Sequence, residues 1–230
     1  MDDNVTYYKN SDGEVLKITK NIYPEDTDNP LFDDEWMNYF TWGTPYASIQ
    51  RHFYREIDDW FNKLVGKGAF RRLKSKSKNF KHFLDLLTSS LDEVGIVAYP
   101  ILKYAENEEA DIIYYVGDDS VQLDGSLVGF AWNEKELLCR RHHCKKFTSE
   151  LFEHTKETVK ISLNSYSLYA NGCIFNFEIY DRNGIELEAA YGVIYETVDE
   201  MLAFVTSEIK NFIEDTNFVK LSDEEIEAVA

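Results

Sequence analysis

The stretch CIFNFEIYDRNGIELEAAYGVIY, Cys173 to Tyr195, decides the fold class. Apolar and polar residues alternate on both sides of the tetrapeptide Asp181-Arg182-Asn183-Gly184, and this pattern is typical of a β-hairpin with a short turn. The stretch therefore predicts two antiparallel strands. Their matching apolar faces are expected to carry Cys173, Phe175, Phe177 and Ile179 on the first strand, and Ile185, Leu187, Ala189, Tyr191 and Val193 on the second.

Helical and strand patterns surround this hairpin, and they do not alternate regularly. Strand patterns occupy residues 13–23, 95–105, 110–117 and 126–132. Apolar residues at helical spacing occupy 47–66, 77–95, 133–143, 148–172 and 196–218. A parallel sheet needs strands that alternate with helices, so the order predicts an α+β protein. We expect a mostly antiparallel sheet of about five to six strands with helices packed on it.

The size and composition indicate a folded globular protein. The chain has 230 residues, of which 44% are hydrophobic, so it can bury a core large enough to offset the entropy lost on folding. Residues 1–220 are predicted to form a single domain, or two intimately packed halves, 1–95 and 96–220. Residues 221–230 are predicted to be an acidic tail.

The sequence does not have the features of a membrane-spanning or secreted protein. No apolar run is long enough to span a membrane, and the acidic N-terminus does not resemble a secretory signal. The three cysteines do not form the pattern of a disulfide framework. The sequence therefore predicts a protein of the cytoplasm.

Charge is distributed unevenly along the chain. The formal net charge is −18, yet residues 61–82 contain eight basic residues and no acidic one. A chain this acidic is repelled by nucleic acid and by anionic membranes except at a local basic patch, and it is attracted to basic protein surfaces. The composition therefore predicts a basic protein partner, no membrane partner, and compatibility with a homodimer.

Two surfaces are candidates for binding. The first mixes carboxylates with aromatic residues in the segment 23–42 and in the acidic turns around 118–124, and its predicted partner-binding residues are Asp26, Asp28, Asp33, Asp34, Glu35, Trp36, Trp42, Asp118, Asp119 and Asp124. The alternative is that these aromatic residues fold back onto the core.

The second candidate surface is the basic segment 63–81, which is predicted to be an exposed loop or strand. Its candidate nucleic-acid-binding residues are Lys67, Arg71, Arg72, Lys74, Lys76 and Lys78. These cations could instead pair with carboxylates of this chain or of a second copy.

No catalytic or metal motif is complete. Asp26, Asp28 and Pro30 begin with calcium-loop spacing, but proline cannot provide a side-chain ligand. The stretch CRRHHC offers Cys139, His142, His143 and Cys144 to a soft metal or as a nucleophile and base, without the spacing of strong zinc motifs. The alternative for that stretch is a helix end with favourable cations. We therefore expect a protein that is not an enzyme and that has no cofactor, with a metal at CRRHHC left open.

Three segments resemble, in order and spacing, a family of uncharacterised proteins carried by phages and mobile elements. They are ITKNIYPEDTDNPLFDDEWMNYFTW, DGSLVGFAWNEKEL and YSLYANGCIFNFEIYDRNGIELEAAYGVIY. Members of that family have an Asp/Asn-rich N-terminal segment with Asn-Pro, a central Trp-Asp-Ser-Gly-x-Val-Gly-Phe signature and a C-terminal Tyr-Leu-x-Gly hairpin. This chain departs from the signature at Leu123, which stands for the tryptophan, and at Gly125-Ser126, where the order is inverted. A further departure is the run 34–38, which replaces Asp-Asn-Leu-Gly.

The resemblance implies an accessory protein of a phage or plasmid. Combined with the acidic composition, it favours an anti-defence protein: an anti-CRISPR or anti-restriction inhibitor that occupies the basic nucleic-acid channel of a host nuclease as a DNA mimic. The alternative is a nucleic-acid-binding accessory factor that uses the basic segment. The two hypotheses predict opposite ligands.

Overall fold

The fold is α+β, with seven helices and nine strands in two antiparallel sheets among the described residues. The computed structural model describes residues 4–21, 29–31, 36–41, 57–106, 111–117, 125–211 and 213–226. The predicted class and the antiparallel pairing are confirmed. The strands are divided between a five-stranded and a four-stranded sheet, whereas the sequence suggested one sheet of intermediate size.

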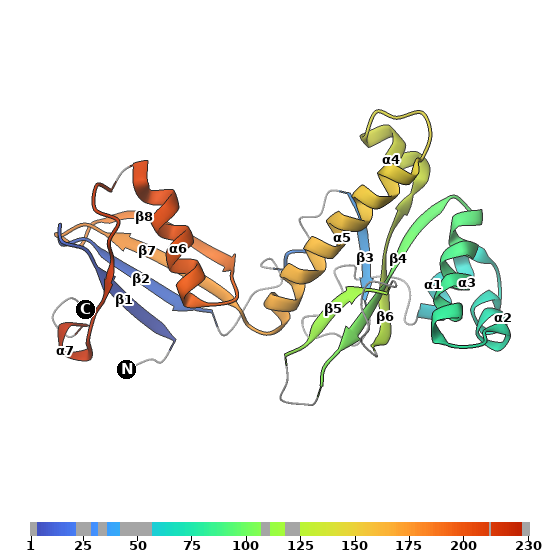
Figure 1. The fold of residues 1–230 in the computed structure, drawn as a ribbon, viewed down its shortest axis with the longest axis horizontal. Coiled ribbons are helices and arrows are strands. Elements are labelled where there is room, and N and C mark those ends of the chain that lie inside the picture. Colours follow the sequence, from blue (N-terminus) through green and yellow to red (C-terminus); the bar gives the residue numbers. More distant parts are fainter. Residues whose placement is uncertain are drawn as a thin grey trace. The chain divides into compact units, whose positions relative to one another are not determined.

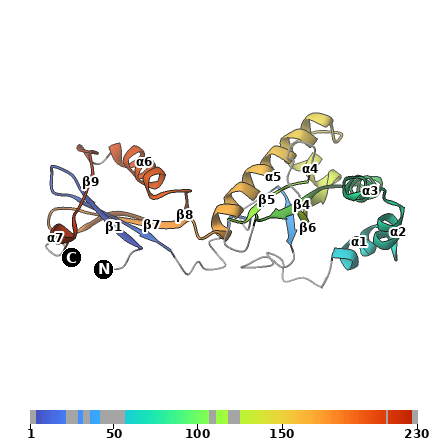
Figure 2. The same ribbon diagram turned by 60° about the horizontal axis from the view of Figure 1, so that its bottom comes forward.

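The chain divides into two compact units (Figures 1 and 2). We call Met1–Asp28 with Leu168–Ala230 the terminal unit, and Asn29–Ser167 the central unit. These boundaries do not coincide with a division at 95/96. The reason is that helix α3, which ends just before that position, packs against strand β4, which follows it.

The terminal unit contains the sheet β8-β7-β2-β1-β9. Its strands are β1 (Val5–Lys9), β2 (Val15–Lys20), β7 (Ile174–Tyr180), β8 (Glu186–Ile194) and β9 (Val219–Lys220). Helix α6 (Val198–Glu208), with the 3-10 turn η2 (Ile209–Asn211), covers one face through Met201 and Val205. Within the predicted tail 221–230, Asp223–Ile226 forms helix α7, and Val219–Lys220 just before the tail pairs with β1.

The predicted hairpin is present, with one correction to its faces. Gly184 adopts a positive φ of 79° in the turn, and Asp181 accepts hydrogen bonds from the backbone N–H groups of Asn183 and Ile185. Phe175, Phe177 and Ile179 are buried as expected. The prediction for the second strand was wrong for Ile185, Leu187 and Tyr191, which are exposed. Two register shifts each insert one extra residue into β8, so strict alternation along this strand fails.

The central unit contains the sheet β3-β6-β4-β5. Its strands are β3 (Asn38–Thr41), β4 (Ile96–Tyr104), β5 (Ile113–Val116) and β6 (Ser126–Glu134), and its helices are α1 (Ile57–Val65), α2 (Ala69–Lys76), α3 (Phe80–Glu93), α4 (Lys135–Arg141) and most of α5 (Ser149–Ala170). Strand β4 is almost continuously buried, because α3 packs on one of its faces and α5 on the other.

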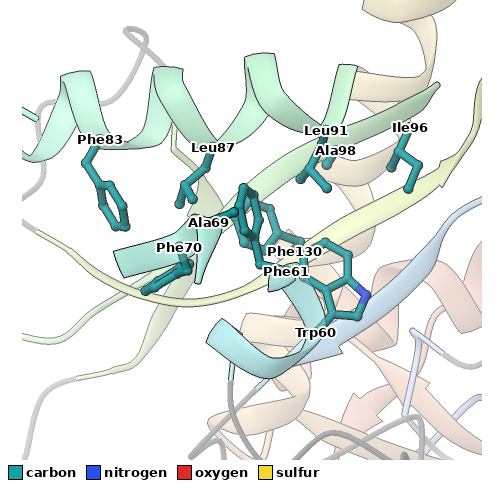
Figure 3. Packing of buried hydrophobic residues seen from close by; sticks show 10 residues of the cluster. All are labelled: Trp60, Phe61, Ala69, Phe70, Phe83, Leu87, Leu91, Ile96, Ala98 and Phe130. Atoms are coloured by element: carbon teal, nitrogen blue, oxygen red, sulfur yellow. The ribbon is translucent and has the colours of Figure 1, made fainter. Parts of the chain in front are cut away.

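Aromatic and aliphatic side chains join the helices α1–α3 to the sheet (Figure 3). The ring of Trp60 stacks on that of Phe130, with 5.1 Å between centroids. Phe70 lies between Phe61 and Phe83, at 5.8 and 5.2 Å, in edge-to-face contacts. These contacts fix α2 on the unit by its buried side, so its other side is presented to solvent on a packed support.

Ser167 ties edge strand β5 to helix α5. Its hydroxyl accepts a hydrogen bond of 2.9 Å from the backbone N–H of Tyr114 and donates one of 2.8 Å to the carbonyl of Leu163. Both Ser167 and Tyr114 are buried. We expect Ser167→Ala to lower the free energy of unfolding by about 1–3 kcal/mol, because it leaves a buried N–H without an acceptor. Chemical denaturation measures this, and Ser165→Ala, at a half-buried position of the same helix, is the control. Equal stability of the two variants would contradict the role given to Ser167.

Candidate functional site

The predicted acidic binding surface falls largely outside the described residues. Trp36 is within them, and the other nine predicted partner-binding residues are not: Asp26, Asp28, Asp33, Asp34, Glu35, Trp42, Asp118, Asp119 and Asp124. The Trp36 ring is half-buried and lies 4.4 Å from the ring of His142, centroid to centroid. Its carbonyl accepts a hydrogen bond from the Asn133 side chain. Trp36 is therefore engaged in contacts within the central unit.

The basic segment is fully described, and part of it is helical. The expectation of a loop or strand around Lys74 and Lys76 was wrong, because both lie in helix α2. The apolar side chains of Ala69, Phe70 and Leu73 share one face of this helix and pack into the core. The cations occupy the remaining circumference.

The six cations of this segment that were predicted to bind nucleic acid are exposed. We call the set Lys67, Arg71, Arg72, Lys74, Lys76 and Lys78 the basic surface, and all six are exposed. Arg71 lies 3.8 Å from Asp58, and Arg72 donates a hydrogen bond to the carbonyl of Lys67. Lys74, Lys76 and Lys78 form no ion pair with any residue in the described ranges. Within the described ranges, internal ion pairs therefore do not account for the charge of these three lysines.

One aromatic residue accompanies the basic surface at its edge. Phe80, the first residue of α3, is 46% exposed and follows Lys78 by two positions. Phe70, the other phenylalanine between Lys63 and Lys81, is buried. Phe80 therefore offers a ring beside cations, which is the combination that stacks bases and contacts phosphates.

A second charged surface lies in the terminal unit. This unit carries 21 acidic and 6 basic residues, a net charge of −15, whereas the central unit carries 21 acidic and 18 basic residues, a net charge of −3. Residues 183–209 contain no lysine or arginine. We call the six acidic residues of this run, all exposed, the acidic surface: Glu186, Glu188, Glu196, Asp199, Glu200 and Glu208.

Part of this acidic surface has a structural use. Thr197 caps helix α6, the Glu200 carboxylate accepts the N–H of Glu196, and Asp199 lies in the first helical turn, where negative charge is favourable. Glu186, Glu188 and Glu208 form no side-chain hydrogen bond or ion pair with another described residue. Their exposure is not explained by the local fold. Sequence reasoning missed this surface, although the absence of cations from 183–209 is visible in the sequence.

No protein-family model matches this chain, and no curated protein and no solved structure is similar enough to count as a match. Function must therefore be argued from the surfaces. Among the helices that the structure describes, none combines the length and apolarity needed to cross a membrane.

The CRRHHC stretch forms a helix C-terminus. His143 has a positive φ of 53° and donates its N–H to Arg140, while Cys144 donates its N–H to the carbonyl of Cys139. This is the Schellman hydrogen-bond pattern, which brings the side chains at its two ends together. Within the described ranges no three His, Cys, Asp or Glu side chains are arranged to hold a metal ion.

The environment of this stretch affects two titrating groups. Burial, and then a hydrogen bond with Cys144, raise the pKa of the Cys139 thiol. Burial, and then His154 and His143, lower the pKa of His142, which favours its neutral form. A buried thiol with a raised pKa is a poor nucleophile, so the geometry does not support catalysis by Cys139.

The thiols are expected to react at different rates. At neutral pH, Cys139 should be alkylated by iodoacetamide at least about tenfold more slowly than Cys144 or Cys173, because it is buried and its thiolate fraction is small. Pulsed alkylation followed by peptide mass spectrometry measures the three rates. Raising the pH should accelerate the labelling of Cys139. Equal labelling of Cys139 and Cys173 at neutral pH would contradict this environment.

Proposed function

We propose that this protein inhibits a basic protein partner by binding it through the acidic surface on β8 and α6. The observation that carries the proposal is the concentration of charge: the terminal unit has a net charge of −15, and a run of 27 residues, 183–209, exposes six carboxylates without one cation. A field of a single sign attracts a partner of the opposite sign and repels nucleic acid. The partner-binding residues predicted in the segment 23–42 remain a separate prediction.

The partner class that fits best is a nucleic-acid enzyme. A channel that binds a polyanion is lined by lysine and arginine, and exposed carboxylates can take the places of phosphates in it. Together with the resemblance to phage and mobile-element proteins, this favours inhibition of a host CRISPR or restriction nuclease. Such an inhibitor needs no catalytic group of its own.

A nuclease-protection assay tests the proposal. The chain is added to purified bacterial restriction and CRISPR nucleases, and DNA cleavage is followed for the wild type and for E186Q/E188Q/E208Q. The matched control is E93Q/E153Q/E157Q, which removes the same charge from exposed positions of the central unit. We expect inhibition of at least one nuclease, relieved by the first variant only. Loss of inhibition in both variants would point to net charge alone, and cleavage unaffected by the wild type would refute inhibition of these nucleases.

A second candidate function is nucleic-acid binding through the basic surface. It is favoured by Lys74, Lys76 and Lys78, which are exposed and form no ion pair within the described ranges, and by the exposed ring of Phe80, two positions after Lys78. If it holds, labelled single-stranded DNA or RNA binds the wild type at moderate salt, and K74Q/K76Q/K78Q weakens binding about tenfold or more. K145Q/K146Q, at two exposed lysines after helix α4, is the control. Wild-type protein that ignores both nucleic acids removes this candidate.

A further inference from the structure

Strand β8 is an edge of the five-stranded sheet (Figure 1). Among the described residues it pairs on one side only, with β7. An edge strand presents unpaired backbone groups and is a ready template for another strand unless it is protected. Strand β8 has an extra residue at Leu187 and another within Tyr191-Gly192, and it carries the carboxylates of Glu186 and Glu188. These charges oppose pairing with another acidic strand, but they attract a strand that carries lysine or arginine.

Exposed apolar residues are concentrated along the chain in β8 and at the position just before it. Ile185 is 62%, Leu187 44% and Tyr191 65% exposed. They account for three of the eight large apolar side chains that are exposed in the described part of the chain, and they fall within seven residues. Leu187 and Tyr191 lie at the two register shifts, and β-bulges commonly redirect side chains near functional sites. Strict alternation would have buried Leu187 and Tyr191. The register shifts leave them outside the core.

We propose that the β8 edge is a docking site for an extended, lysine- or arginine-bearing segment of a protein partner. The inference rests on the proposed function and specifies where and how the partner is held. Ile185, Leu187 and Tyr191 form the apolar centre of the contact, and Glu186 and Glu188 form its charged rim. This is the usual anatomy of an interface, in which aromatic and aliphatic anchors contribute most of the affinity and the charged rim contributes specificity.

Charge complementarity selects this partner over a second copy of the chain. Two copies of β8 paired edge to edge would bring their glutamates together, and each copy has a net charge of −18. Like charges on facing strands are destabilising. A segment with lysine or arginine places opposite charges at the rim and can still extend the sheet at its edge.

A model peptide tests the site directly. The probe is a fluorescein-labelled peptide of about ten residues that alternates lysine with valine, and the same peptide with glutamate in place of lysine is its control. We expect the lysine peptide to bind the full-length protein and the glutamate peptide not to bind. L187S/Y191S should weaken binding by about tenfold or more, because it removes the anchors and keeps every charge. I161S, at a position that is 63% exposed on α5, should bind like the wild type.

Amide chemical shifts locate the contact. Titration of ¹⁵N-labelled protein with the lysine peptide should move the signals of residues 185–191 and not those of residues 198–208. Circular dichroism confirms that the variants are folded. No binding by the wild type, equal binding by L187S/Y191S, or shifts confined to α6 would each overturn the inference.

The inference and the proposed function can fail separately. Nuclease inhibition that survives L187S/Y191S but is lost in E186Q/E188Q/E208Q would leave the acidic surface as the inhibitory site and would remove the docking edge. Peptide binding at β8 without inhibition of any nuclease would keep the docking edge and remove the proposed target class.

Discussion

Replacing Phe130 with alanine is expected to lower the free energy of unfolding of the central unit by about 3–5 kcal/mol. Phe130 is fully buried, stacks on Trp60, and lies on β6 between β3 and β4. Its ring is the point at which helices α1–α3 meet the sheet (Figure 3). Truncation removes apolar contacts from both layers and leaves a cavity that a sheet strand cannot collapse to fill.

Urea denaturation followed by tryptophan fluorescence measures this effect, because Trp60 and Trp132 adjoin the site. Phe80→Ala is the matched control, since it makes the same chemical change at a residue that is 46% exposed, and it should shift stability by less than about 0.5 kcal/mol. If Phe130→Ala cost no more than Phe80→Ala, the packing in Figure 3 would be wrong.

Local signals in the sequence predicted much of the secondary structure. The turn 181–184 is a clear case, because Asp181 organises it through hydrogen bonds to residues two and four positions away and Gly184 adopts the positive φ. The helix cap at Thr197 is equally local. Such features depend on neighbours in the chain, so a pattern over a few residues is enough to indicate them.

Features set by distant parts of the chain were missed. Alternating lysines concealed helix α2, whose apolar face is defined by contacts with α1 and α3. The hairpin faces were wrong at Leu187 and Tyr191 because the register shifts in β8 are a property of its pairing with β7. The grouping of the two chain ends into one unit arises from pairing of β2 with β7, about 160 residues apart along the chain.

The candidate sites show the same division between composition and arrangement. The charge of the basic segment is visible in the sequence, because residues 61–82 contain eight cations and no acidic residue. The sequence did not show which phenylalanine near these cations could contact a ligand. The fold decides this, because it buries Phe70 and exposes Phe80. The acidic surface of 183–209 was not predicted, because its signal in the sequence is the absence of cations over 27 residues and not a dense group of carboxylates like that of the segment 23–42.

Association with the inhibited nuclease is expected to slow by about ten- to a thousandfold as salt is raised from low to high concentration. The screening length falls from about 30 Å at 0.01 M ionic strength to about 3 Å at 1 M, so the six exposed carboxylates of 183–209 stop acting on a partner at a distance. Their effect is mainly on the encounter, because rim charges steer association while buried anchors hold the complex.

Stopped-flow or surface-plasmon measurements of the association and dissociation rates distinguish the two contributions. E186Q/E188Q/E208Q should associate more slowly at low salt, with a shallower salt dependence and a dissociation rate close to that of the wild type. L187S/Y191S should do the opposite: it should keep the salt dependence and dissociate about tenfold faster. The charge-matched variant E93Q/E153Q/E157Q should retain most of the wild-type salt dependence of the association rate, because its substitutions lie in the central unit and leave every carboxylate of 183–209 in place. If the salt dependence of the association rate fell equally in both triple variants, net charge and not the acidic surface would drive the encounter. Only a localised field depends on which carboxylates are removed.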